Sequence, residues 1–170
     1  MLEIIAILCL IGALVLLFFL SLIDLREGLL PNELVLGLLC LGVVFHLCTL
    51  YAFVSFSEMA LGAFIGSGIL YFIRTLASLY YGDDALGLGD VKLLGAAGVW
   101  LGPYYVLVGM TAGAIIGVFH GLGVALLLWG QTKKMPNLNN LSLPAGPGFA
   151  GGIVVAGVYA FWTFPSLVLP

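Results

Sequence analysis

Two aspartates lie in apolar surroundings where a carboxylate is costly. Asp24 closes the first apolar stretch of the chain, and Asp90 ends the tetrapeptide Gly87-Leu88-Gly89-Asp90 at the head of a later one. Ionisable side chains at membrane depth are expensive, so they mark functional sites by default. Two carboxylates in one site can share a proton, which is the arrangement of aspartyl proteases. The pair therefore predicts hydrolysis with Asp24 and Asp90 as catalytic residues.

The glycines before Asp90 and the lysine after it complete the predicted site. Gly87 and Gly89 carry no side chain, so an extended peptide or a neighbouring helix can approach the carboxylate closely. Asp90 also stands where a helix N-cap belongs, and capping is compatible with catalysis. Lys92 lies two residues further on. Turned inward it would favour a charged carboxylate, and exposed it would be a membrane-surface anchor. We assign Gly87, Gly89 and Lys92 to the active-site loop.

Other chemistries find little support in the residue types. His46 and His120 fall inside apolar stretches, and we interpret both as hydrogen-bonded packing residues. The three cysteines, Cys9, Cys40 and Cys48, have no CxxC spacing. No Ser–His, Cys–His or metal-ligand spacing is present, so neither a metal nor a cofactor is expected. The net charge is −3, and the absence of a basic run argues against nucleic acid as a partner.

The composition predicts the elements that must position these residues. The chain is 63% hydrophobic and 8% charged, whereas soluble domains carry roughly 25% charged residues. A spanning helix needs about 20 apolar residues. We expect an all-α, polytopic integral membrane protein that forms one domain over residues 1–170. Its six transmembrane helices are predicted at about Leu2–Ile23, Glu33–Tyr51, Glu58–Tyr81, Asp90–Leu101, Tyr104–Trp129 and Gly148–Leu167.

The positive charges predict how this layout is oriented. With six alternating spans, all of them fall on one side of the membrane or at its border: Arg26, Arg74, Lys92, Lys133 and Lys134. Loops rich in lysine and arginine stay in the cytoplasm. We therefore expect a multi-pass plasma (inner) membrane protein with both termini outside the cytoplasm. Asp24 and Asp90 then lie toward the cytoplasm.

The fourth predicted helix is short, which bears on the depth of Asp90. From Asp90 to Leu101 it measures about 18 Å, against roughly 30 Å of hydrocarbon. If Trp100 anchors at the outer interface, Asp90 lies below the cytoplasmic surface, in a cavity that water can enter.

The two aspartates lie at opposite ends of their helices. A helix dipole disfavours a negative charge at the C-terminal end of the helix, where Asp24 lies, and favours one at the N-terminal start, where Asp90 lies. This predicts that Asp90 holds most of the charge and Asp24 most of the shared proton.

Three segments together resemble the catalytic domain of the type IV prepilin peptidases, a family of membrane aspartyl proteases. Ile23-Asp24-Leu25 followed by Leu30-Pro31-Asn32-Glu33-Leu34 resembles the segment of the family's first aspartate, although Asn32 stands where many members have Asp. Residues 87–96, continued by Trp100-Leu101-Gly102, resemble its GxGD helix. Leu143-Pro144-Ala145-Gly146-Pro147 resembles its PFGP stretch, with Ala145 in place of the usual aromatic residue. The similarity covers nearly the whole chain.

The resemblance implies an aspartic endopeptidase that removes the short basic leader from type IV prepilins or type II secretion pseudopilins at the cytoplasmic membrane face. Its partners would be these precursors and the lipid bilayer. Larger bacterial members carry an N-terminal extension with paired CxxC motifs that bind zinc and accompany N-methylation. Since this sequence has no CxxC pair, we do not expect N-methyltransferase activity.

Two alternatives fit part of the same pattern. A presenilin-like intramembrane protease shares the GxGD tetrapeptide, but there the first aspartate usually follows a tyrosine in mid-helix, whereas Asp24 follows Ile23 at a helix end. A small proton- or cation-coupled transporter also uses paired intramembrane carboxylates. Such proteins more often show inverted repeats or helices broken at the midplane, and this sequence shows no convincing internal repeat.

Overall fold

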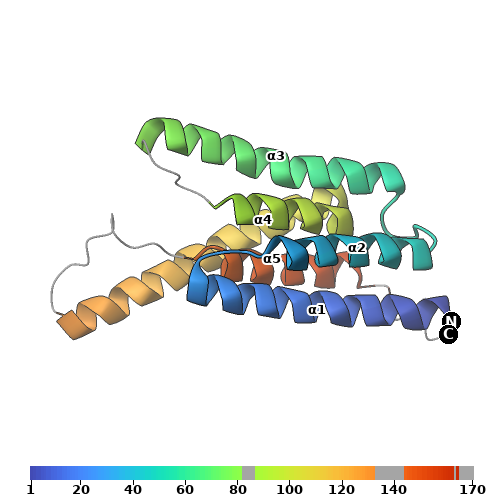
Figure 1. Cartoon of the computed structure of the whole chain (residues 1–170), viewed down its shortest axis with the longest axis horizontal. Helices are drawn as coiled ribbons and strands as arrows, with labels where there is room; N and C mark the ends of the chain where they lie inside the picture. The colour runs from blue at the N-terminus through green and yellow to red at the C-terminus, as the bar shows by residue number, and fades with distance from the viewer. Residues whose placement is uncertain (82–86, 133–143, 163, 165–170) are drawn as a thin grey trace.

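The protein is a bundle of long apolar helices (Figure 1). The computed structural model describes residues 1–81, 87–132, 144–162 and 164, and within these it contains no strand. The helices are α1 (Leu2–Glu27), α2 (Asn32–Cys48), α3 (Phe56–Tyr81), α4 (Leu88–Thr132) and α5 (Gly146–Ala160). The predicted all-α class is confirmed.

Length and composition make three of these helices candidates for crossing a membrane. They are α1, residues 56–80 of α3 and residues 88–127 of α4, while α2 and α5 are shorter apolar helices. Large apolar side chains also cover the outside of the bundle; on α1 they include Ile4, Leu8, Ile11 and Phe18. A soluble monomer rarely shows an apolar surface of this extent. The outer surface is therefore suited to lipid.

A break at Gly102 divides α4 into two legs, 88–101 and 103–132. Gly102 has φ 68° and ψ −177°, and Pro103 follows it. The positive φ costs a residue with a side chain about 1–2 kcal/mol, so glycine suits the position. In Figure 1 the second leg runs back against the first. The helix stop predicted at Gly102-Pro103 is confirmed.

Several helix boundaries differ from the prediction. α1 continues past Ile23 to Glu27, α3 begins at Phe56 and not at Glu58, and α5 ends at Ala160. α2 ends at Cys48 and not at Tyr51, because Leu50 and Tyr51 turn the chain with φ values of 51° and 58°. α5 begins at Gly146 and not at Gly148, with a proline in its first turn. Pro is favoured there because its missing N–H is not needed by the helix. The C-terminal part of the last predicted helix, residues 165–167, lies outside the described residues.

The first leg of α4 is central to the packing. α4 packs against α2, α3 and α5, and α1 packs against α2 and α5. Glycines make the closest crossings: a Cβ placed on Gly98 would overlap the backbone of Gly62 in α3, and one placed on Gly152 of α5 would overlap the backbone of Gly109. Small residues allow this approach in lipid. Gly62 and Gly109 therefore serve close helix packing.

An aromatic core lies at the end of the bundle that holds the α2–α3 connection. Phe45 is fully buried and stacks on Trp100, with ring centroids 5.2 Å apart. Phe53 and Phe161 also pack against Phe45. Trp100 is buried, and its indole N–H donates to the carbonyl oxygen of Leu38 at 2.8 Å. The polar end of its ring therefore finds its partner inside the protein, so Trp100 is not the exposed anchor on which the estimate of the depth of Asp90 was conditional.

Candidate active site

The structure brings Asp24 and Asp90 together. Asp24 lies in the last turn of α1 and Asp90 in the first turn of α4. Both side chains are buried, with 6% of each exposed, and their carboxyl groups are close enough to interact electrostatically. Two carboxyl groups in such a site do not both ionise cheaply, so one proton is held between them.

The N-terminus of α5 holds the Asp24 carboxyl group. The backbone N–H of Gly146 donates to Asp24 Oδ2 at 2.8 Å, and this bond is buried. A Cβ on Gly146 would lie 2.6 Å from the same oxygen, so only glycine leaves room for the carboxyl group. Sequence reasoning placed Gly146 in a family segment but gave it no role. The Pro147 that follows marks the helix start, and this was the only sequence signal of the contact.

Asp90 has a different environment. Its Oδ1 is buried and has no hydrogen-bond partner among the residues that the structure describes. An unpaired buried carboxylate oxygen is costly, whereas a protonated carboxyl group can donate to a neighbour. A bound N–H favours the charged form of Asp24. These contacts oppose the division of charge predicted from the helix ends, because that argument considered α1 and α4 without the α5 N-terminus.

The two predicted loop glycines lie where a side chain would intrude. A Cβ on Gly87 would lie 3.3 Å from Asp90 Oδ2. A Cβ on Gly89 would lie 2.8 Å from the Cβ of Leu30, which belongs to the connection between α1 and α2. The missing side chain of Gly89 therefore lets the segment that follows Asp24 pass close by. This is the close approach near Asp90 that the sequence predicts.

Lys92 is exposed and points to the start of α2. Its Nζ donates to Asn32 Oδ1 at 2.8 Å. The hydrogen bond joins the segment after Asp24 to the segment after Asp90, on the same side as the Leu30–Gly89 contact. Of the two orientations considered for Lys92, the structure shows the exposed one. The contact between Asn32 and Lys92 joins residues 60 positions apart, and no local sequence pattern predicts it.

The two histidines lie apart from this site. His46 is fully buried, and its Nε2–H donates to the carbonyl oxygen of Trp100 at 3.0 Å, so its predicted packing role is confirmed. His120 is exposed on the second leg of α4, so the packing role predicted for it is wrong. Within the described residues, no three side chains of His, Cys, Asp and Glu lie together as a metal ion requires.

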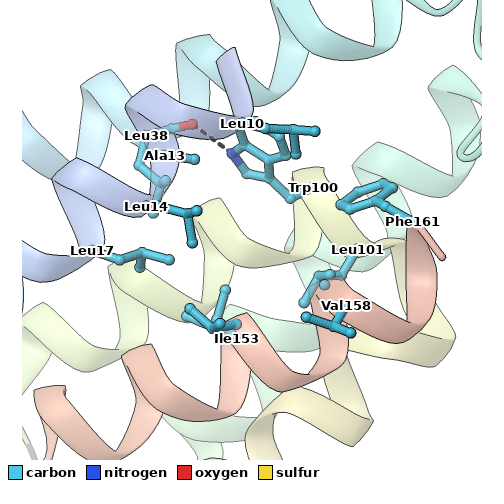
Figure 2. A pocket seen from close by; sticks show the side chains of 12 residues that line it. Leu10, Ala13, Leu14, Leu17, Leu38, Trp100, Leu101, Ile153, Val158 and Phe161 are labelled. Atoms are coloured by element: carbon cyan, nitrogen blue, oxygen red, sulfur yellow. Dashed lines mark hydrogen bonds between the residues drawn. The ribbon is translucent and has the colours of Figure 1, made fainter. Parts of the chain in front are cut away.

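An apolar cavity of the bundle is also separate from the aspartates. It measures about 230 Å³ and lies between α1, α2, α4 and α5. Figure 2 shows Leu14, Leu17, Ile153 and Val158 pointing into it, and the Trp100–Leu38 hydrogen bond at its edge. Among the described residues, its lining contains no ionisable side chain that could perform acid–base chemistry.

Comparison with known proteins identifies the family of this chain. A profile of the type IV leader peptidase family matches residues 10–122, a range that contains both aspartates. The chain belongs to this family. It resembles a prepilin leader peptidase/N-methyltransferase of Aeromonas hydrophila, and the two are 38% identical over 69% of this chain and 40% of that protein. The protein of the same name from Pectobacterium carotovorum is 37% identical over 84% of this chain and 49% of its own length.

A third relative of that name, from Escherichia coli K12, is 34% identical over 84% of this chain and 59% of its own length. The chain thus spans about half the length of the curated relatives it matches. No solved structure shows significant similarity to it. The family and the apolar helices together indicate a protein of the inner membrane.

Proposed function

We propose that this chain is a membrane aspartic endopeptidase that removes the short basic leader from type IV prepilins or type II secretion pseudopilins. One observation carries the proposal: in a leader peptidase family member, two buried aspartates from distant helices meet in one site. The relatives named above are prepilin leader peptidases. Family membership disfavours the transporter and the presenilin-like alternatives.

The proposed mechanism uses the unequal surroundings of the two carboxyl groups. Asp24, held by the Gly146 N–H, is the carboxylate that takes a proton from water as the oxygen attacks the scissile carbonyl carbon. Asp90 is the carboxylic acid that donates its proton to the carbonyl oxygen. When the tetrahedral intermediate collapses, the C–N bond breaks, the leaving nitrogen takes the proton from Asp24, and Asp90 regains its own. No covalent acyl-enzyme forms.

Membrane orientation forms part of the proposal. Counting the two legs of α4 separately, we infer six segments that cross the membrane. Together they form one catalytic domain. Arg26 and Lys92 lie at the same end of the bundle as Asp24 and Asp90, while Lys133 and Lys134 lie outside the described residues. The positive-inside rule places this end toward the cytoplasm and both termini on the other side.

The direct test replaces each aspartate by its uncharged isostere. Asp24→Asn and Asp90→Asn should each lower cleavage of a purified prepilin by roughly 100-fold or more, because each removes one proton-transfer group. The matched control is Glu27→Gln, which removes an exposed acid at the same end and should cleave normally. Cleavage is followed by the mass of the shortened product. Near wild-type cleavage by either aspartate variant would remove that residue from the catalytic pair.

A further inference from the structure

A groove separates α2 from α3 above the first leg of α4. Both helices pack on α4, which lies between them in Figure 1. The groove has a volume of about 560 Å³. Leu36 of α2 and Phe64 of α3 form its exposed rims, and Gly95 lies in its floor. Since α2, α3 and this leg are apolar on their outer surfaces, the groove opens toward the hydrocarbon of the membrane.

The two ends of the groove differ in chemistry. At the deep end, Leu39 and Ala63 pack on a buried cluster that contains Met59 and Val99. At the other end lie Asn32 and Lys92, the end that also holds the aspartates. Between these ends the groove is apolar apart from Ser67, whose hydroxyl group donates to the carbonyl oxygen of Ala63 at 2.7 Å. Among the described residues that line it, Lys92 carries the one positive charge, where the groove meets the membrane surface.

The charge of Lys92 is available to a ligand. Among the described residues, the partner of its Nζ is the neutral oxygen of Asn32. An ammonium group has three donors, so the two others point away from this bond. A basic side chain at the cytoplasmic end of a groove between membrane helices is the usual arrangement for an anionic lipid headgroup.

We propose that this groove binds one anionic phospholipid, with an acyl chain between α2 and α3 and the headgroup on Lys92. The charge decides among occupants: a positive Lys92 attracts an anionic amphiphile and repels the basic leader of the proposed substrate. A bound lipid would fill the gap between α2 and α3 and brace the leg of α4 that carries Asp90. Lipid binding in this groove can be measured without any peptidase assay.

The test compares two lipids with identical acyl chains, phosphatidylglycerol and phosphatidylcholine, by native mass spectrometry of the full chain released from mixed micelles. We expect one tightly held lipid and about a fivefold preference for phosphatidylglycerol, which corresponds to about 1 kcal/mol for one basic residue. Lys92→Gln should abolish the preference. Arg26→Gln, which removes an exposed charge at the same end, should retain it. Equal loss in both variants, or no preference in the wild type, would overturn the proposal.

A second measurement identifies the occupant directly and does not depend on a charge variant. A photoreactive benzophenone side chain at position 36, on the groove rim, should yield an adduct with the mass of phosphatidylglycerol in membranes that contain it. The same group at position 61, exposed on α3 outside the groove lining, should label lipids without preference. An adduct at position 36 with a prepilin peptide or with a second copy of the chain, in place of lipid, would contradict the assignment.

Discussion

At the scale of single residues, Gly146 determines how Asp24 is held. Its N–H provides the hydrogen bond to the carboxyl group, and its missing side chain provides the space. Gly146→Ala would place a methyl group 2.6 Å from Asp24 Oδ2, and the carboxyl group would have to move. A misplacement of about 1 Å from a reactive geometry can cost about 100-fold in rate.

We therefore expect Gly146→Ala to lower kcat for prepilin cleavage by at least about tenfold while the protein still folds. The control on the same helix is Gly157→Ala, where an added Cβ meets nothing within 4 Å. Its kcat should equal that of the wild type. Steady-state kinetics on purified protein in detergent would measure both. Equal kcat values for the two variants would mean that Asp24 does not need the α5 N-terminus.

The division of charge between the aspartates gives a second prediction at this scale. Asp24 accepts a hydrogen bond from the Gly146 N–H, whereas Asp90 Oδ1 is buried with no donor in the described part of the chain. We therefore expect the shared proton to reside mainly on Asp90. The pair titrates as a unit, and the statement concerns a population. In infrared difference spectra near neutral pH, the band of the protonated carboxyl group should disappear in Asp90→Asn. Its loss in Asp24→Asn alone would restore the opposite assignment.

At the scale of elements, the crossing of α3 and the first leg of α4 fixes where Asp90 lies. This leg is short, roughly 21 Å, and begins within the bundle. Its closest contact is between Gly98 and Gly62, where the two backbones touch. In lipid, where the hydrophobic effect does not drive helices together, such contacts provide much of the association energy. The position of Asp90 therefore depends on small residues two turns away.

Enlarging this contact should destabilise the bundle. Gly98→Ala would overlap the backbone of Gly62, and overpacking of a tight core costs about 1–3 kcal/mol. Gly68→Ala on α3, where a Cβ meets nothing within 4 Å, should be neutral or stabilising by up to about 1 kcal/mol, since alanine is the better helix former. Unfolding in a denaturing-detergent titration would measure both free energies. An equally stable Gly98→Ala variant would show that the two helices separate without cost.

At the scale of the whole molecule, the sequence predicted the elements better than their mutual contacts. Hydropathy located the helices, and Gly102-Pro103 located the turn in α4, because both signals are local. The Gly146–Asp24 bond joins residues 122 positions apart and depends on how α1 crosses α5, which no local pattern encodes. The surroundings of Trp100 likewise depend on contacts between helices: a tryptophan near a helix end suits a membrane interface, but here its buried indole N–H donates to the carbonyl oxygen of Leu38.

The orientation of the molecule in the membrane supplies the last prediction. The end of α1 and the start of α4 lie at one end of the bundle, and the α2–α3 connection lies at the other (Figure 1). The positive-inside rule assigns the first end to the cytoplasm through Arg26 and Lys92. A reporter enzyme fused after residue 129 should therefore report a cytoplasmic position, and one fused after Phe53 a position across the membrane. The reverse pair of readings would place Asp24 and Asp90 on the far side, away from any precursor that still carries its leader in the cytoplasm.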